Sequence, residues 1–171
     1  MQMFSFTRLH WVLCGLICAM TLTACGFEMR GVQNMTFENL YIQGSLSISK
    51  ALNKSLAVNG VKIVKDPEQA ELMLDLMSES SEKRILSLSG AGVVREYDLI
   101  YRVTYRLKEQ GIELWGEPKM IELRRDYSYS DRDVLATGYE EVRLNAEMRQ
   151  EATQQLLRSL VTYKVKKPSV T

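Results

Sequence analysis

Histidine and cysteine are almost absent from this chain. Its 171 residues include one histidine, His10, and three cysteines, Cys14, Cys18 and Cys25, so neither type occurs beyond residue 25. The rest of the chain therefore cannot form a disulfide, a Cys/His metal site, a thiol nucleophile or a Ser-His-Asp triad. We accordingly expect no catalytic residues, no bound metal and no cofactor other than a covalent lipid.

The chain also lacks an excess of one charge and a long hydrophobic run. It has 22 Lys and Arg residues against 21 Asp and Glu residues, which argues against a general nucleic-acid binder. Its clearest apolar stretch, Trp11 to Met20, is 10 residues long. A helix that crosses a bilayer needs about 20 apolar residues, so this stretch is too short to span a membrane.

The N-terminal stretch is typical of a signal peptide. The apolar run follows Arg8 and is succeeded by small or hydroxylated residues up to Leu22-Thr23-Ala24-Cys25. Those four residues resemble the lipobox of bacterial lipoprotein precursors. The resemblance implies cleavage before Cys25, an S-diacylglycerol group on its sulfur and an N-acyl chain such as palmitate. Several acyl chains on one residue hold a protein durably on a membrane.

This processing would leave 147 residues, a length that favours one domain. The polypeptide after Cys25 would then contain neither histidine nor a second cysteine. We expect a lipoprotein signal peptide at 1–24, a lipidated tether at 25–36, a single α+β domain at 37–162 and a flexible tail at 163–171.

Hydrophobic periodicity predicts strands and two helices within that domain. Apolar residues occupy alternate positions from Tyr97 to Leu107, which is typical of a half-buried strand, and only Ile100 breaks the pattern. Further strands are predicted at 37–43, from Glu71 to Leu88 with a polar interruption at 78–84, and after Pro118.

The first predicted helix follows Gly44, with Ser45 as its cap and Asn59-Gly60 as its stop. A capping box at Thr137 and Glu140 begins the second, whose apolar band comprises Leu144, Met148, Ala152, Leu156 and Leu160. We therefore predict an α+β two-layer sandwich, in which one roughly four-stranded, mostly antiparallel sheet carries two helices on one face. The other face must meet water, a ligand or a partner.

Basic residues on the predicted strands suggest what that second face binds. Arg102 and Arg106 lie on the polar side of the alternating strand, and Lys119, Arg124 and Arg125 lie on or just after the next strand. Arginine forks bind phosphate oxygens bidentately, and lysine adds a point charge. The alternative is a solvated face whose cations are balanced by acidic neighbours.

Three other motifs could support chemistry but lack the required companions. Ser47 and Lys50 have the Ser-x-x-Lys spacing of some hydrolases, although the other motifs of that class are missing. Asp126, Asp131 and Asp133 lack the spacing of a calcium-binding loop and resemble turn formers. Gly90-Ala91-Gly92 indicates a turn, because Arg95 stands where a nucleotide-binding loop needs its third glycine.

A family resemblance runs through nearly the whole mature sequence. It rests on Cys25-Gly26-Phe27-Glu28-Met29-Arg30-Gly31, Arg84-Ile85-Leu86-Ser87, Glu96-Tyr97-Asp98-Leu99, Arg125-Asp126-Tyr127-Ser128-Tyr129, Val134-Leu135-Ala136, Glu140-Glu141 and Glu147-Met148-Arg149, in this order and spacing. Together these segments are similar to the lipopolysaccharide-assembly lipoprotein family, LptE.

The resemblance implies a non-catalytic lipoprotein on the periplasmic face of the cell outer membrane. Members plug a large β-barrel of the LptD type, help it to assemble and bind lipopolysaccharide. The resemblance also implies outer-membrane sorting, because Gly26 rather than an aspartate follows the acylated cysteine. Basic residues that some members use for lipopolysaccharide correspond here to the neighbourhoods of Gly90 and Thr137. A lipid-anchored chaperone for another envelope protein and a small envelope hydrolase are the alternative functions.

Overall fold

The computed structural model describes residues 35–130 and 134–164. The expected signal peptide, nearly all of the expected tether and most of the expected tail lie outside these ranges. Within the described residues, no helix has the length and apolar character needed to cross a membrane.

The described residues form an α+β domain around one five-stranded sheet, whose strand order is β2-β1-β3-β4-β5. Strand β1 pairs in parallel with β2 and β3, whereas the β3/β4 and β4/β5 pairs are antiparallel. The predicted fold class is confirmed, and a short fifth strand is added at the sheet edge. The strands are β1 (Asn39–Gln43), β2 (Lys62–Val64), β3 (Leu72–Leu88), β4 (Val94–Glu109) and β5 (Lys119–Ser128).

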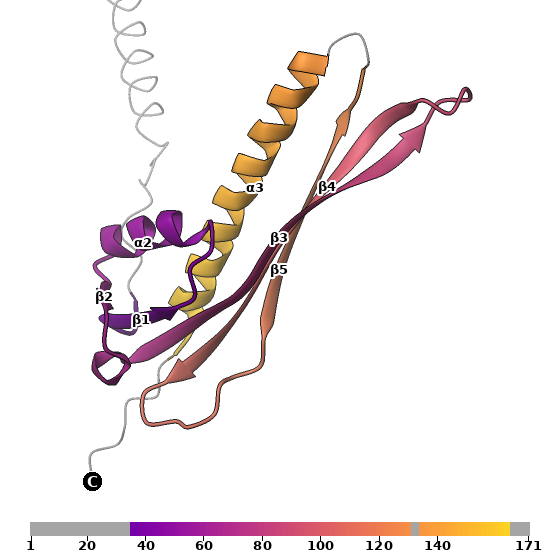
Figure 1. Ribbon diagram of the computed structural model, residues 1–171. Coiled ribbons are helices and arrows are strands. Elements are labelled where there is room, and N and C mark those ends of the chain that lie inside the picture. Colours follow the sequence, from indigo (N-terminus) through magenta and orange to yellow (C-terminus); the bar gives the residue numbers. More distant parts are fainter. Residues whose placement is uncertain (1–34, 131–133, 165–171) are drawn as a thin grey trace, which may run out of the picture. The chain divides into compact units, whose positions relative to one another are not determined.

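Two α-helices, α2 (Ser49–Val58) and α3 (Val134–Thr162), pack on one face of this sheet (Figure 1). A single 3-10 turn, η1 (Pro67–Gln69), precedes β3. The apolar core lies between the sheet and the helices, because removing these side chains from water is the main force that holds the layers together. All five residues of the predicted apolar band of α3 are buried there.

The helix starts differ from those predicted. Ile48, not Ser45, is the N-cap residue of α2, and it makes no side-chain capping bond. Helix α3 already includes Val134, so Thr137 lies within it rather than at its cap. The predicted stop of α2 is confirmed, since the amide of Asn59 donates to the carbonyl oxygens of Ser55 and Leu56.

Strands β3 and β4 form a long hairpin that only partly belongs to the wider sheet. Strand β1 pairs with the first residues of β3 alone, Leu72 to Asp75. The hairpin therefore extends beyond β1 and β5 (Figure 1). A turn around Gly90 closes it, as the sequence predicted, with the amide of Ser89 bonded to the carbonyl of Val93.

Gly44 lets the chain pass close to β3 as it leaves β1. Its φ of +87° lies in the left-handed region, and an added Cβ would collide with the carbonyl oxygen of Leu76. Glycine meets both requirements, because it has no Cβ and adopts positive φ readily.

Candidate functional site

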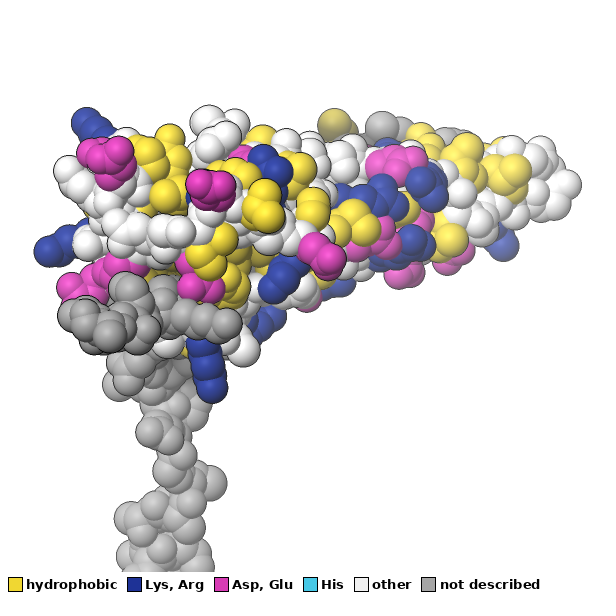
Figure 2. Space-filling model, turned by 90° about the horizontal axis from the view of Figure 1, so that it is seen from below, with side chains coloured by type: hydrophobic (Ala, Val, Ile, Leu, Met, Phe, Trp, Pro, Cys, Tyr) yellow, Lys and Arg dark blue, Asp and Glu magenta, His cyan; other side chains and the backbone are white. Residues whose placement is uncertain are grey.

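The open face of the sheet, defined as the face without helices, carries most of the predicted cations. Alternation along β4 points Arg102, Thr104 and Arg106 to this face, while Tyr101, Val103 and Tyr105 point to the core. Figure 2 shows Lys and Arg side chains interspersed with Asp and Glu side chains rather than gathered into a surface of one sign.

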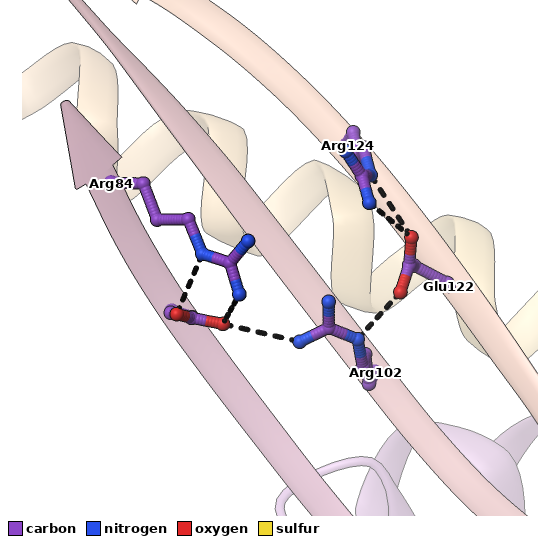
Figure 3. Close-up of polar contacts among 5 residues, drawn as sticks. Arg84, Arg102, Glu122 and Arg124 are labelled. Carbon is purple, nitrogen blue, oxygen red and sulfur yellow. Dashed lines mark hydrogen bonds and ion pairs between the residues drawn. The ribbon is translucent and has the colours of Figure 1, made fainter. Parts of the chain in front are cut away.

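Five charged side chains form a continuous row across three strands of the open face, which we call the charge ladder (Figure 3). Arg84 on β3 holds Glu82 through two hydrogen bonds of 2.7 and 2.8 Å. Arg102 on β4 donates to Glu82 at 3.2 Å and also to Glu122 on β5. Arg124 donates to Glu122 at 2.9 Å, which completes the row.

The ladder keeps its carboxylates ionised. Hydrogen bonds from Arg84 and then Arg102 lower the pKa of Glu82, and those from Arg102 and then Arg124 lower the pKa of Glu122. Three guanidinium groups thus face two carboxylates. The central Arg102 side chain is 25% exposed, whereas Arg124 at the end is 57% exposed, so the ends are the more accessible to an anion.

The ladder also explains why Ile100 interrupts the alternation of β4. Ile100 lies on the open face, paired with Glu82 on one side and Arg124 on the other, yet it is fully buried. It does not belong to the apolar cluster beneath the helices. We infer that the long side chains of the ladder cover it, since long charged side chains can shield apolar surface with their methylene stems.

Arg106 has a separate partner set, at the other end of the open face. Its Nε atom donates to Asp75 Oδ2 at 2.8 Å, and Asp75 is largely buried. Its guanidinium carbon lies 4.8 Å from the centre of the Trp115 ring, and Lys108 Nζ lies 5.8 Å from the same ring. Contacts of this kind hold a cation over an aromatic face.

The structure brings together only part of the predicted cation set. Arg102, Arg106 and Arg124 share the open face. Arg125 instead points to the helical face, where it pairs with Glu151 of α3. Lys119 also belongs to the helical side by alternation, because it shares the parity of the buried Ile121.

Arg84 is a ladder residue that sequence reasoning missed. The polar stretch at 78–84 suggested an interrupted strand, but β3 is continuous and has register shifts instead. The alternation of Ser80, Glu82 and Arg84 was the available signal, since it places all three on one face. The parity of Arg125 with Tyr127 could likewise have shown that this arginine faces the core side.

A second polar cluster holds the start of α3 against strands β3 and β5. Lys83 Nζ lies 2.6 Å from Glu141 Oε2, and the Tyr127 hydroxyl donates to the same oxygen at 2.8 Å. Burial acts to raise the pKa of Glu141, but the hydrogen bonds from Lys83 and Tyr127 outweigh it, and the net effect lowers that pKa. Lys83 also lies 4.1 Å from the centre of the Tyr97 ring.

Glu79 of β3, whose side chain is 10% exposed, joins three other elements on the helical face. Its carboxylate accepts hydrogen bonds from the Tyr101 hydroxyl at 2.6 Å and from the Ile48 amide at 3.2 Å, and Arg149 Nε lies 3.7 Å away. Burial is the main reason that the pKa of Tyr101 rises, with the hydrogen bond to Glu79 second. The cluster ties β4 and the start of α2 to α3.

The other sequence motifs do not assemble into a reactive site. Ser47 lies in the turn before α2, and Lys50 is the second residue of that helix. Asp126 pairs with Asp98 across the strands, while Asp131 and Asp133 lie outside the described residues. No group of three or more potential metal-ligating side chains occurs within 35–130 and 134–164.

Comparison with known proteins gives consistent matches. The model of the family LptE, described as lipopolysaccharide-assembly, matches residues 32–160. The chain is 29% identical over 162 residues to the LPS-assembly lipoprotein LptE of Yersinia enterocolitica, which covers 90% of this chain and 76% of the relative.

Solved structures agree with the sequence matches. Rare lipoprotein B from Shewanella oneidensis superposes with a TM-score of 0.66 at 34% identity, covering 73% of this chain and 95% of that one. Lipoprotein B from Nitrosomonas europaea superposes with a TM-score of 0.65 at 35% identity, covering 78% and 88%.

Proposed function

Because the chain belongs to the LptE family of lipopolysaccharide-assembly lipoproteins, we propose that it plugs and helps to assemble an outer-membrane export barrel of the LptD type and binds lipopolysaccharide. The observation that carries this proposal is the family match, which runs through the described domain. The family role is non-catalytic, so the hydrolase alternative at Ser47 and Lys50 is set aside.

The proposed anchor is a covalent lipid on Cys25. Cleavage after Ala24 would make Cys25 the first residue, with an S-diacylglycerol group and an N-acyl chain, and would place the protein on the periplasmic face of the outer membrane. Mass spectrometry of the mature chain tests this directly. An unmodified Cys25, or a chain that remains in the soluble fraction, would contradict it.

We propose that the barrel wall contacts the end of the domain formed by the tip of the β3–β4 hairpin and the start of α3. Leu86 and Leu88 of the hairpin are exposed, and so are Leu135, Tyr139 and Val142 of α3. Exposed apolar side chains of this kind are common where a protein meets a partner. Photoreactive residues at positions 86 and 135 are expected to crosslink to a barrel in outer membranes, and crosslinking to a different envelope protein would favour the chaperone alternative.

For lipopolysaccharide, we propose that its phosphates bind the charge ladder by replacing carboxylates as partners of the arginines. Phosphate oxygens accept the same forked hydrogen bonds that Glu82 and Glu122 now accept. Arg84 and Arg124 are exposed at the two ends, so they would meet a phosphate first. Arg102 would act from the centre, and Arg106 would serve a second phosphate farther along the face.

The experiment compares lipopolysaccharide binding by full-length variants in detergent. Arg84→Gln combined with Arg124→Gln, and Arg102→Glu combined with Arg106→Glu, are each expected to weaken binding by about tenfold or more, as loss of charge-assisted hydrogen bonds allows. Arg125→Gln is the matched control, because this arginine is also ion-paired on β5 but faces the helices. Undiminished binding by folded ladder variants would overturn this site.

A further inference from the structure

The loop between β4 and β5, residues 110–118, presents apolar side chains to solvent. Leu114 is 81% exposed, more than any other large apolar side chain that is exposed in the described part of the chain. Ile112, two residues earlier, is also exposed. Neither side chain contributes to the apolar core.

This loop has a defined conformation. The Gln110 side chain donates to the Glu68 carbonyl at 2.7 Å, and the Gly116 amide donates to the Leu107 carbonyl at 2.9 Å. The Trp115 ring lies against Arg106 and Lys108, as described above. The loop is therefore held at both ends and near its centre, with Leu114 left outside.

The loop begins at the end of the domain where the chain enters the fold. Glu109, at the end of β4, accepts a hydrogen bond from the Tyr163 hydroxyl at 3.0 Å. The Tyr163 carbonyl in turn accepts one from Thr36 at 2.8 Å, next to the first described residue. Figure 1 shows the same loop near the end of α3 and away from the tip of the β3–β4 hairpin.

Chain length then limits how far this end can lie from an anchored lipid. Met35 lies ten positions after Cys25, and an extended chain spans at most about 3.6 Å per position, or about 36 Å in all. This step rests on the lipidation of Cys25 in the proposed function. Given that lipid, the loop stays within reach of the membrane surface.

We propose that loop 110–118 is a membrane-contacting loop, which places Leu114 and Ile112 at the boundary between lipid headgroups and acyl chains. Trp115 suits this position, because tryptophan prefers the membrane–water interface. The contact is apolar rather than electrostatic, since Glu113 and Glu117 offset the flanking lysines. It forms on the lipidated protein by itself, with no barrel present, and keeps the anchored end of the domain on the bilayer.

The sequence supplies an internal probe for this contact. The chain has 2 tryptophans, and removal of residues 1–24 leaves Trp115 alone. The mature lipidated chain is placed in uncharged phosphatidylcholine vesicles in which a fraction of the lipid carries bromine atoms near the headgroup end of the acyl chains. We expect strong quenching of Trp115 emission and a shift of that emission to shorter wavelength, both unchanged when anionic lipid is added.

Two substitutions, at side chains of nearly equal exposure, test whether the quenching depends on this loop or on any exposed leucine of the domain. Leu114→Ser is expected to remove most of the quenching without changing the melting temperature. Leu135→Ser is the matched control, because Leu135 is 79% exposed but lies at the start of α3. It should leave the quenching unchanged. Wild-type Trp115 that is not quenched, or equal loss in both variants, would overturn the inference.

A second experiment distinguishes failure of the membrane contact from failure of the proposed lipidation of Cys25. If the chain does not float with vesicles, lipidation of Cys25 has failed, and with it that part of the proposed function. Cys25 is also the last cysteine in the sequence, so the unlipidated mature chain can be coupled through this thiol to a maleimide phospholipid. The coupled chain should still show the quenching of Trp115, and its absence there would refute the membrane contact whatever the natural anchor.

Discussion

Replacing Ile100 by alanine tests whether the charge ladder covers an apolar side chain. Loss of a fully buried isoleucine side chain costs about 2 to 5 kcal/mol, depending on how well the site can collapse. Ile100 is fully buried but lies outside the core cluster, and we infer that long, flexible side chains cover it rather than a packed helix. These can close partly over the gap, so we expect the lower part of that range, about 2 to 3 kcal/mol.

Urea unfolding, followed by circular dichroism, measures this change. Leu99→Ala, on the same strand but in the core, should cost about 3 to 5 kcal/mol. Thr104→Ala, on the open face and only partly buried, should cost less than about 1 kcal/mol and controls for strand preference. A cost for Ile100→Ala no larger than that for Thr104→Ala would refute the idea that the ladder buries this residue.

Two further substitutions probe the backbone and the acid sensitivity of the domain. Gly44→Ala should destabilise the fold by roughly 1 to 3 kcal/mol in urea unfolding, because of its positive φ and the collision with Leu76, whereas Gly90→Ala should be nearly neutral, since nothing lies near an added Cβ there. Burial acts to raise the pKa of Glu141, but the hydrogen bonds from Lys83 and Tyr127 outweigh it, so the pKa lies below its ordinary value of 4.5. The ionised Glu141 therefore stabilises the folded state at pH values above 4.5, and this stabilisation is lost as the pH falls through the lowered pKa. Unfolding midpoints at pH 7 and pH 3.5 should therefore differ less for Glu141→Gln than for the wild type, and an unchanged difference would contradict this role.

Local patterns were enough to predict the main elements. The alternation from Tyr97 to Leu107 correctly identified the core side of β4, and the band from Leu144 to Leu160 correctly identified the buried side of α3. Both depend on periods of two and of about 3.6 residues, which are properties of the chain itself. The fold class followed because these elements must bury their apolar sides against one another.

The pairing of strands that are distant in the sequence could not be predicted from such local patterns. The edge strand β2 has three residues, and its parallel pairing with β1 depends on the path that α2 takes between them. The joint position of Arg84, Arg102 and Arg124 likewise depends on strand register. Register depends on how the apolar patterns of two strands match and on the turn that joins them, and the pattern of one strand alone does not contain this information. The sequence showed that Ile100 breaks the alternation of β4, but explaining this break required knowing which residues of β3 and β5 lie beside it.

We propose above that arginines of the open face bind lipopolysaccharide through its phosphates. The most direct measurement compares binding of intact and dephosphorylated lipopolysaccharide to the full-length protein in the same detergent. Dephosphorylation should weaken binding by about tenfold or more, and Arg84→Gln combined with Arg124→Gln should abolish most of this difference. Equal affinity of the wild type for both forms would contradict it.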